Sequence, residues 1–118
     1  MKNIFIVEDD RKMALAVEST LKNEQYNIES FDSTKQFLEK IKDTHPDLVI
    51  LDIVLPDGDG RQLCDILKRD PITAHIPVIM ISGYFTQDQI TYDACADGYL
   101  QKPFDVEDLR YMVKHSFN

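Results

Sequence analysis

The sequence is poor in cysteine, glycine and proline, and it has no long apolar run. Its 118 residues contain 2 cysteines, 4 glycines and 5 prolines, and 43% of the residues are hydrophobic. Two cysteines cannot form the disulfide framework of a small secreted protein, and so little glycine and proline excludes collagen-like and low-complexity chains. The apolar runs fall far short of the roughly 20 residues of a membrane-spanning helix. Length and composition therefore predict one compact globular domain.

Basic residues are scarce relative to acidic ones. The sequence has 13 Lys and Arg residues and 21 Asp and Glu residues, so the formal net charge is −8. Such a chain lacks the positive surface that binds nucleic-acid phosphates, and an anionic membrane surface would repel it. We therefore expect no direct nucleic-acid or membrane partner. No secretory signal pattern opens the sequence, and the cytoplasm is the expected compartment.

The two cysteines, Cys64 and Cys95, both lie inside predicted helices among apolar neighbours. A cysteine in that setting usually behaves as a small buried hydrophobic residue. We expect two buried free thiols, with an intramolecular bridge between them or a redox role as the alternatives.

Strand and helix patterns alternate along the whole chain. Strands are predicted over residues 4–7, 27–31, 48–51, 77–81 and 98–101, and helices over 10–24, from Ser33 to before His45, between Gly60 and Asp70, over 86–96 and over 105–115. Such alternation calls for a parallel sheet that is covered on both faces. Right-handed crossovers and the chain length favour an α/β, flavodoxin-like doubly wound fold with five strands in the order 2-1-3-4-5 and five helices.

Charged and polar side chains stand where four of these strands end. Glu8 and Asp9 follow the first strand, Asp52 the third, Ser82 the fourth and Lys102 the fifth. Parallel strands bring their carboxyl ends to one edge of the sheet, and ligands bind there, where the strand order reverses. Carboxylates gathered at that edge without a cation would repel one another. Because hard oxygen ligands suit Mg²⁺, the sequence predicts a magnesium site at this edge.

Other acids near the same edge have structural explanations. Asp10 is expected to cap the helix that it precedes, and Asp105 is a plausible cap for the last helix. Asp57 and Asp59 are expected to serve the turn at 56–60 and the start of the helix after it.

Four segments of the chain resemble the receiver domains of two-component response regulators, of which the chemotaxis receiver is the minimal form. They are residues 6–10, 47–60, 76–83 and 98–104, in the family's order and at the strand ends. The resemblance implies a phosphorylation-dependent signalling receiver, served by a sensor histidine kinase or a histidine phosphotransfer protein. A downstream effector protein or a fused output domain would read its state. We expect a single receiver domain over 1–118, no effector domain in this chain, and no enzymatic activity beyond its own phosphotransfer and dephosphorylation.

The same resemblance gives roles to individual residues. Asp52 is similar to the phosphoacceptor of the family, whose carboxylate also contacts the Mg²⁺. Asp9 is similar to a direct Mg²⁺ ligand and Glu8 to one that acts through water. The backbone carbonyl of Val54 is the third protein ligand implied.

The resemblance also implies a switch. Ser82 is similar to the switch hydroxyl, Lys102 to the lysine that contacts the phosphoryl group, and Tyr99 to the switch aromatic residue. The bond between Lys102 and Pro103 is similar to the cis peptide of the family. A peptide bond before proline is the one kind in which the cis form has a low free-energy cost.

Switching would repack the face formed by residues 86–96, 98–101 and 105–115, through which the family also forms homodimers. The segment around 86–96 is about two residues shorter than is common in the family, and Cys95 stands where a glycine is usual. Tyr84, two positions after Ser82, is predicted to shield an acyl phosphate from water.

Two other functions remain as alternatives. One is a receiver-like adaptor that is not phosphorylated, against which the set of Asp9, Asp52, Ser82 and Lys102 argues. The other is a Mg²⁺-dependent phosphohydrolase with an aspartyl-phosphate intermediate. Such enzymes of the haloacid dehalogenase type carry a second carboxylate two positions after the nucleophile, where this chain has Val54.

Overall fold

The computed structural model describes residues 1–83 and 96–117. Tyr84, Cys95 and the helix predicted over 86–96 lie outside the described residues. The strands are β1 (Asn3–Val7), β2 (Asn27–Phe31), β3 (Leu48–Asp52), β4 (Val54–Leu55), β5 (Gly58–Asp59), β6 (Val78–Ser82) and β7 (Gly98–Gln101). The described helices are α1 (Arg11–Lys22), α2 (Thr34–Ile41), α3 (Gly60–Arg69) and α5 (Val106–Ser116). None of these helices has the length and apolar character needed to cross a bilayer.

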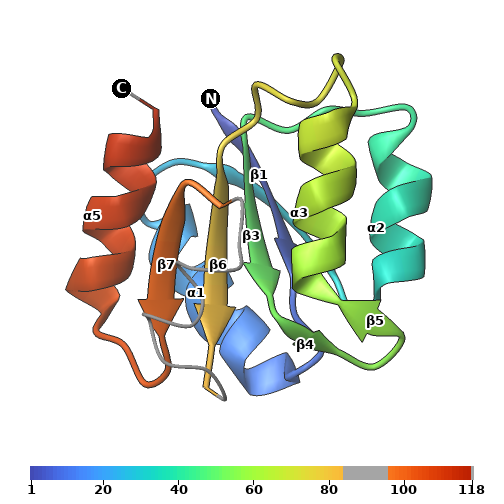
Figure 1. Ribbon diagram of the computed structural model, residues 1–118. Helices are drawn as coiled ribbons and strands as arrows, with labels where there is room; N and C mark the ends of the chain where they lie inside the picture. Colours follow the sequence, from blue (N-terminus) through green and yellow to red (C-terminus); the bar gives the residue numbers. More distant parts are fainter. Residues whose placement is uncertain (84–95, 118) are drawn as a thin grey trace.

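The main sheet has five parallel strands in the order β2-β1-β3-β6-β7. This order confirms the predicted doubly wound topology, in which the connections reverse direction between β1 and β3. Because neighbouring strands are all parallel, their carboxyl ends share one edge, and the β1, β3, β6 and β7 arrows point toward it in Figure 1, while both chain termini lie toward the opposite edge. The separate antiparallel pair β4-β5 lies directly after β3.

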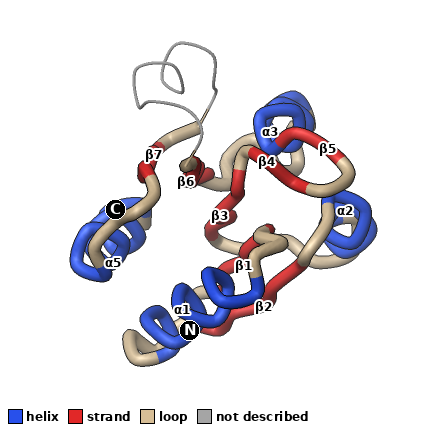
Figure 2. Tube along the Cα trace, turned by 90° about the horizontal axis from the view of Figure 1, so that it is seen from below, coloured by secondary structure: helices blue, strands red, loops and turns tan. Residues whose placement is uncertain are grey.

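Helices cover both faces of the sheet, with α1 and α5 on one side and α2 and α3 on the other (Figure 2). Successive residues of a strand point to opposite faces, so each central strand supplies both cores. The core under α2 and α3 includes Phe5, Val7, Phe31, Phe37, Val49, Leu51, Leu63, Leu67 and Met80. The core under α1 and α5 includes Ile4, Ile6, Val17, Leu21, Leu48, Ile50, Ile79, Ile81, Leu109 and Val113.

Local capping follows the sequence at three helices. The Asp10 carboxylate accepts hydrogen bonds from the Lys12 and Met13 amides at 3.0 and 3.3 Å and so begins α1 as predicted. Ser33 caps α2 and Asp59 caps α3 through their side chains. α5 begins after Asp105, whose side chain forms no capping hydrogen bond.

The structure contradicts the expectation that Cys64 is a free thiol. Cys64 lies on the inner side of α3 and is fully buried, as its apolar neighbours predicted. It is not a free thiol, however, because Cys64 is disulfide-bonded in the structure. Helical periodicity shows which side of a helix is buried, but it does not show which distant segment of the chain approaches that side.

Gly60 is the point at which the chain passes closest to β3. A Cβ atom added to Gly60 would lie 2.1 Å from the carbonyl oxygen of Asp52 and 3.1 Å from Cα of Ile53. Its own amide donates to the carbonyl of Ile53 at 2.7 Å. The backbone from Asp52 to Gly60 therefore closes on itself tightly enough to exclude any side chain at this position.

We predict that Gly60→Ala destabilises the protein by about 2–3 kcal/mol, because the new methyl group must push backbone atoms apart. Helix propensity alone predicts the opposite sign, since alanine favours the first turn of α3. Urea unfolding measures the difference. Gly83→Ala is the control, because its Cβ would lie 3.5 Å from Lys102 Cβ, an ordinary contact distance. Equal stabilities of the two variants would contradict the prediction.

Candidate functional site

The carboxyl ends of four parallel strands bring the predicted polar residues together. Asp52 is the last residue of β3 and Ser82 the last of β6, and Glu8 and Lys102 follow β1 and β7 directly. Glu8, Asp52 and Ser82 are 3%, 6% and 0% exposed, in a region otherwise built from apolar strands. Asp9 is exposed beside them.

Lys102 connects the two buried carboxylates. Its Nζ donates to Oε1 of Glu8 at 2.9 Å and to Oδ2 of Asp52 at 3.2 Å. The second oxygen of each carboxylate accepts from a backbone amide, Glu8 Oε2 from Asp10 at 3.3 Å and Asp52 Oδ1 from Val54 at 3.2 Å. All four carboxylate oxygens thus have a donor, as burial of such groups requires.

Burial and crowding change the proton affinity of this cluster. Desolvation by burial and the neighbouring Asp52 together raise the pKa of Glu8 to about 7, although the Lys102 ammonium acts to lower it. Burial alone would lower the pKa of Lys102, but its hydrogen bonds and ion pairs with Glu8 and Asp52 outweigh burial and raise it. One ammonium therefore does not balance the carboxylates around it.

The carboxylates have the donor set of a divalent cation site. One oxygen from each of Glu8, Asp9 and Asp52 can be chosen so that all three lie within 4.8 Å of one another. Such all-oxygen, carboxylate-rich groups fit Mg²⁺, which also retains waters. The residues predicted to hold the metal through their side chains are therefore adjacent. Val54, whose backbone carbonyl is the remaining predicted ligand, lies two residues after Asp52 and is 44% exposed.

Tyr99 lies farther back along β7. It pairs with Met80 of β6 and packs against the core under α2 and α3, half-buried. Its hydroxyl donates to the Ala96 carbonyl at 3.1 Å. Ser82, two residues after Met80, belongs to the same face of the sheet as Tyr99. The Lys102–Pro103 peptide is cis, as the sequence led us to expect.

Asp57 has a role that the sequence did not indicate. Its carboxylate accepts from the amides of Thr34 at 2.8 Å and Lys35 at 3.1 Å, at the start of α2. These bonds lower the pKa of Asp57. A separation of more than 20 residues leaves no local pattern from which this contact could have been read.

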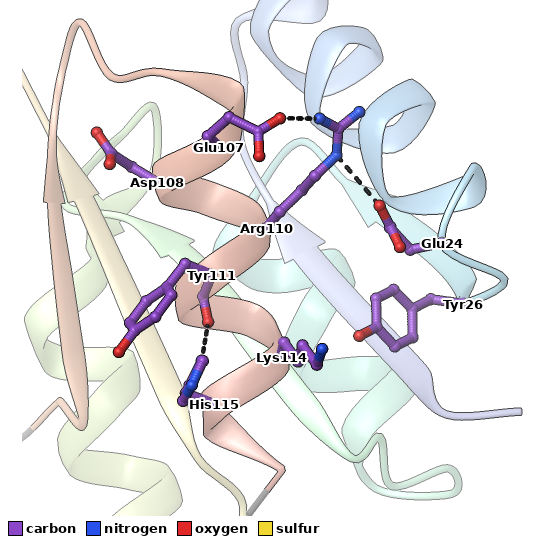
Figure 3. A pocket seen from close by; sticks show the side chains of 8 residues that line it. All are labelled: Glu24, Tyr26, Glu107, Asp108, Arg110, Tyr111, Lys114 and His115. Carbon is purple, nitrogen blue, oxygen red and sulfur yellow. Dashed lines mark hydrogen bonds and ion pairs between the residues drawn. The ribbon is translucent and has the colours of Figure 1, made fainter.

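A polar hollow of about 530 Å³ lies away from this edge, between α5 and the chain that leads from α1 into β2 (Figure 3). Three of its charged residues form ion pairs with one another. Arg110 pairs with Glu107 one turn away and, through Nε at 3.2 Å, with Oε1 of Glu24. The Arg110–Glu24 pair attaches α5 to the turn that follows α1, and the hollow is separate from the carboxylate cluster.

Comparison with known proteins agrees with the site. The response regulator receiver domain family matches residues 4–114. The DNA-binding dual master transcriptional regulator RpaA of Synechocystis is 38% identical over 117 residues, which are 97% of this chain and 48% of RpaA. The chain thus spans about half the length of this curated relative.

Solved structures are similar over almost the whole chain. A putative response regulator from Chloroflexus aurantiacus has a TM-score of 0.92 at 30% identity and covers 98% of this chain and 97% of its own. The phosphorylated cyanobacterial phytochrome response regulator RcpA has a TM-score of 0.81 at 27% identity, with 97% and 89% covered. The chain belongs to the receiver domains of two-component response regulators.

The buried carboxylate of Glu8 gives a pH-dependent prediction for the metal-free protein. Its pKa is about 7 when folded and near 4.5 when unfolded, so the folded state holds more protons between these values. This contribution to stability is present below the unfolded pKa and is lost as the pH rises through the folded one. Glu8→Gln cannot ionise, so its free energy of unfolding should increase relative to wild type between about pH 5 and pH 8.

Urea unfolding in EDTA at both pH values measures this difference. Glu39→Gln, an exposed carboxylate on α2, serves as the control and should track the wild type. If the two variants respond alike to pH, Glu8 ionises as freely as a surface carboxylate and the prediction is wrong.

Proposed function

We propose that the chain is a phosphorylatable receiver in which Asp52 accepts a phosphoryl group and, together with Glu8, Asp9 and the Val54 carbonyl, holds Mg²⁺. The observation that carries the proposal is the contact of Lys102 with both Glu8 and Asp52 at the carboxyl ends of the strands. Residues 1–118 act as one receiver domain in this proposal.

The transfer is an in-line displacement at phosphorus. A carboxylate oxygen of Asp52 forms the new O–P bond while the N–P bond of a phosphohistidine breaks, and the electron pair stays on the histidine nitrogen, which then takes up a proton. The transition state is loose, with charge spread over the phosphoryl oxygens, so positioning and charge stabilisation provide the catalysis. Mg²⁺ at this site would supply positive charge against the carboxylate and the phosphoryl oxygens.

The remaining polar residues act on the product. Lys102 already lies 3.2 Å from Oδ2 of Asp52 and supplies a second positive charge to the phosphoryl oxygens. Ser82 ends the neighbouring strand β6, one residue beyond the Asp52 partner Ile81, and donates its hydroxyl to a phosphoryl oxygen. These groups would catalyse the protein's own phosphotransfer and dephosphorylation only.

Phosphorylation changes the charge at Asp52, and the output face responds. The acyl phosphate carries about one more negative charge than the carboxylate and draws the Ser82 hydroxyl toward it. Tyr99, on the same sheet face, then gives up its bond to Ala96 and rotates into the space that Ser82 vacates. The face that includes β7 and α5 repacks as a result.

The partners follow from the same chemistry. The donor is a sensor histidine kinase or a histidine phosphotransfer protein, and the acceptor of the signal is an effector protein or a fused output domain. A net charge of −8 does not favour direct DNA contact by this domain. Homodimerisation through the β7 and α5 face remains a prediction.

Intact mass after incubation with acetyl phosphate and Mg²⁺ tests the proposal. The wild type should gain one phosphoryl group, and Asp52→Ala should gain none because the nucleophile is missing. Asp9→Asn should slow the gain about tenfold by weakening metal binding. Asp65→Asn removes an exposed carboxylate of α3 and should behave as wild type.

The other outcomes each identify a different function. Repeated release of inorganic phosphate without accumulated phosphoprotein would indicate the phosphohydrolase. No mass gain and no phosphate release would indicate the unphosphorylated adaptor. A mass gain that survives Asp52→Ala would place the modification at another residue.

A further inference from the structure

The loop that follows Asp52 is fixed at both ends. At its start, the Val54 amide donates to the Asp52 carboxylate. At its end, the Gly60 amide donates to the Ile53 carbonyl at 2.7 Å, and the Asp59 carboxylate caps α3 by accepting from the Arg61 amide at 2.8 Å. Between these points, β4 and β5 pair as a small hairpin, Val54 with Asp59 and Leu55 with Gly58.

The tip of this hairpin has a third attachment, to another element. Asp57 at the tip accepts from the Thr34 and Lys35 amides, the first two of α2. Gly58 packs against Thr34 so closely that an added Cβ would lie 3.1 Å from the Thr34 methyl group. A carboxylate at the positive end of a helix is well placed electrostatically as well.

α2 does not depend on Asp57 alone for its cap. The Ser33 hydroxyl accepts from the Gln36 amide at 3.2 Å, the ordinary capping bond within the helix. The helix thus has one cap from its own sequence and one from the loop beside the phosphorylation site. The second cap is the one that ties the loop to α2.

Val54 needs such an attachment because its side chain does not provide one. That side chain is 44% exposed, and two-residue strands are too short to hold their own position. We propose that Asp57 is a positioning residue for the phosphorylation site: by capping α2 from the hairpin tip, it fixes the Val54 backbone beside Asp52. The effect on metal binding rests on the function proposed above, whereas the effect on the backbone does not.

Hydrogen exchange of the Val54 amide in the metal-free protein tests the attachment. Asp57→Ala removes both bonds to α2, and we expect this amide to exchange about tenfold faster. Ser33→Ala is the matched control, because it removes a cap from the same helix without touching the hairpin. It should lower the stability of the protein and leave Val54 exchange, corrected for that stability, unchanged.

Calorimetric titration with Mg²⁺ tests the consequence. Asp57→Ala should bind Mg²⁺ about tenfold more weakly, as the loss of an outer positioning contact does in other metal sites. Asp32→Asn removes one exposed negative charge after β2, at the same sheet edge, and controls for charge alone. Its Mg²⁺ affinity should stay close to that of the wild type.

The two measurements separate the inference from the proposed function. If the wild type binds no Mg²⁺, the proposed function fails, while Val54 exchange still decides whether Asp57 holds the loop. The inference is overturned if the Val54 amide exchanges equally fast in Asp57→Ala and Ser33→Ala. It is also overturned if Asp57→Ala binds Mg²⁺ as tightly as Asp32→Asn does. In either case Asp57 is only a cap of α2.

Discussion

The ammonium of Lys102 lies between two buried carboxylates, and the arrangement of the strand ends depends on that contact. Glu8 and Asp52 belong to neighbouring strands and would repel each other in an apolar setting. Lys102 reaches both because its backbone amide bonds to the Ser82 carbonyl at 2.8 Å, which continues the pairing of β6 with β7. The position of one side chain thus depends on the register of the sheet. A register shift of one residue would direct Lys102 to the other face.

The residual negative charge explains why this edge of the sheet is suited to binding rather than to stability. A buried ion pair often contributes little to folding, because desolvation offsets the attraction. Here the balance is still less favourable, since one cation faces more than one carboxylate. The raised pKa of Glu8 reflects how unfavourable its negative charge is in this buried position beside Asp52. Any positive charge that binds at this edge relieves it, so binding and stability are linked.

Much of the fold and of the site could be predicted from the sequence, because parallel strands place their last residues at one edge. The strand order alone was enough to predict that four polar residues lie together, namely Glu8, Asp52, Ser82 and Lys102. The β4-β5 hairpin could not be predicted in the same way, since two-residue strands leave no periodicity. The bonds of Asp57 to α2 depend on tertiary approach over a long separation. The disulfide-bonded state of Cys64 likewise could not be predicted from the apolar pattern around it.

The close approach at Gly60 also sets a limit on length. The nine residues from Asp52 to Gly60 are held at both ends by hydrogen bonds of backbone amides and in the middle by hydrogen bonds to α2. The segment therefore cannot take up an added residue or lose one without breaking these bonds. Surface loops usually accept insertions at small entropic cost. This loop should accept changes of side chain at its exposed positions but not changes of residue count. Natural length variation in proteins with this arrangement should therefore fall outside this segment.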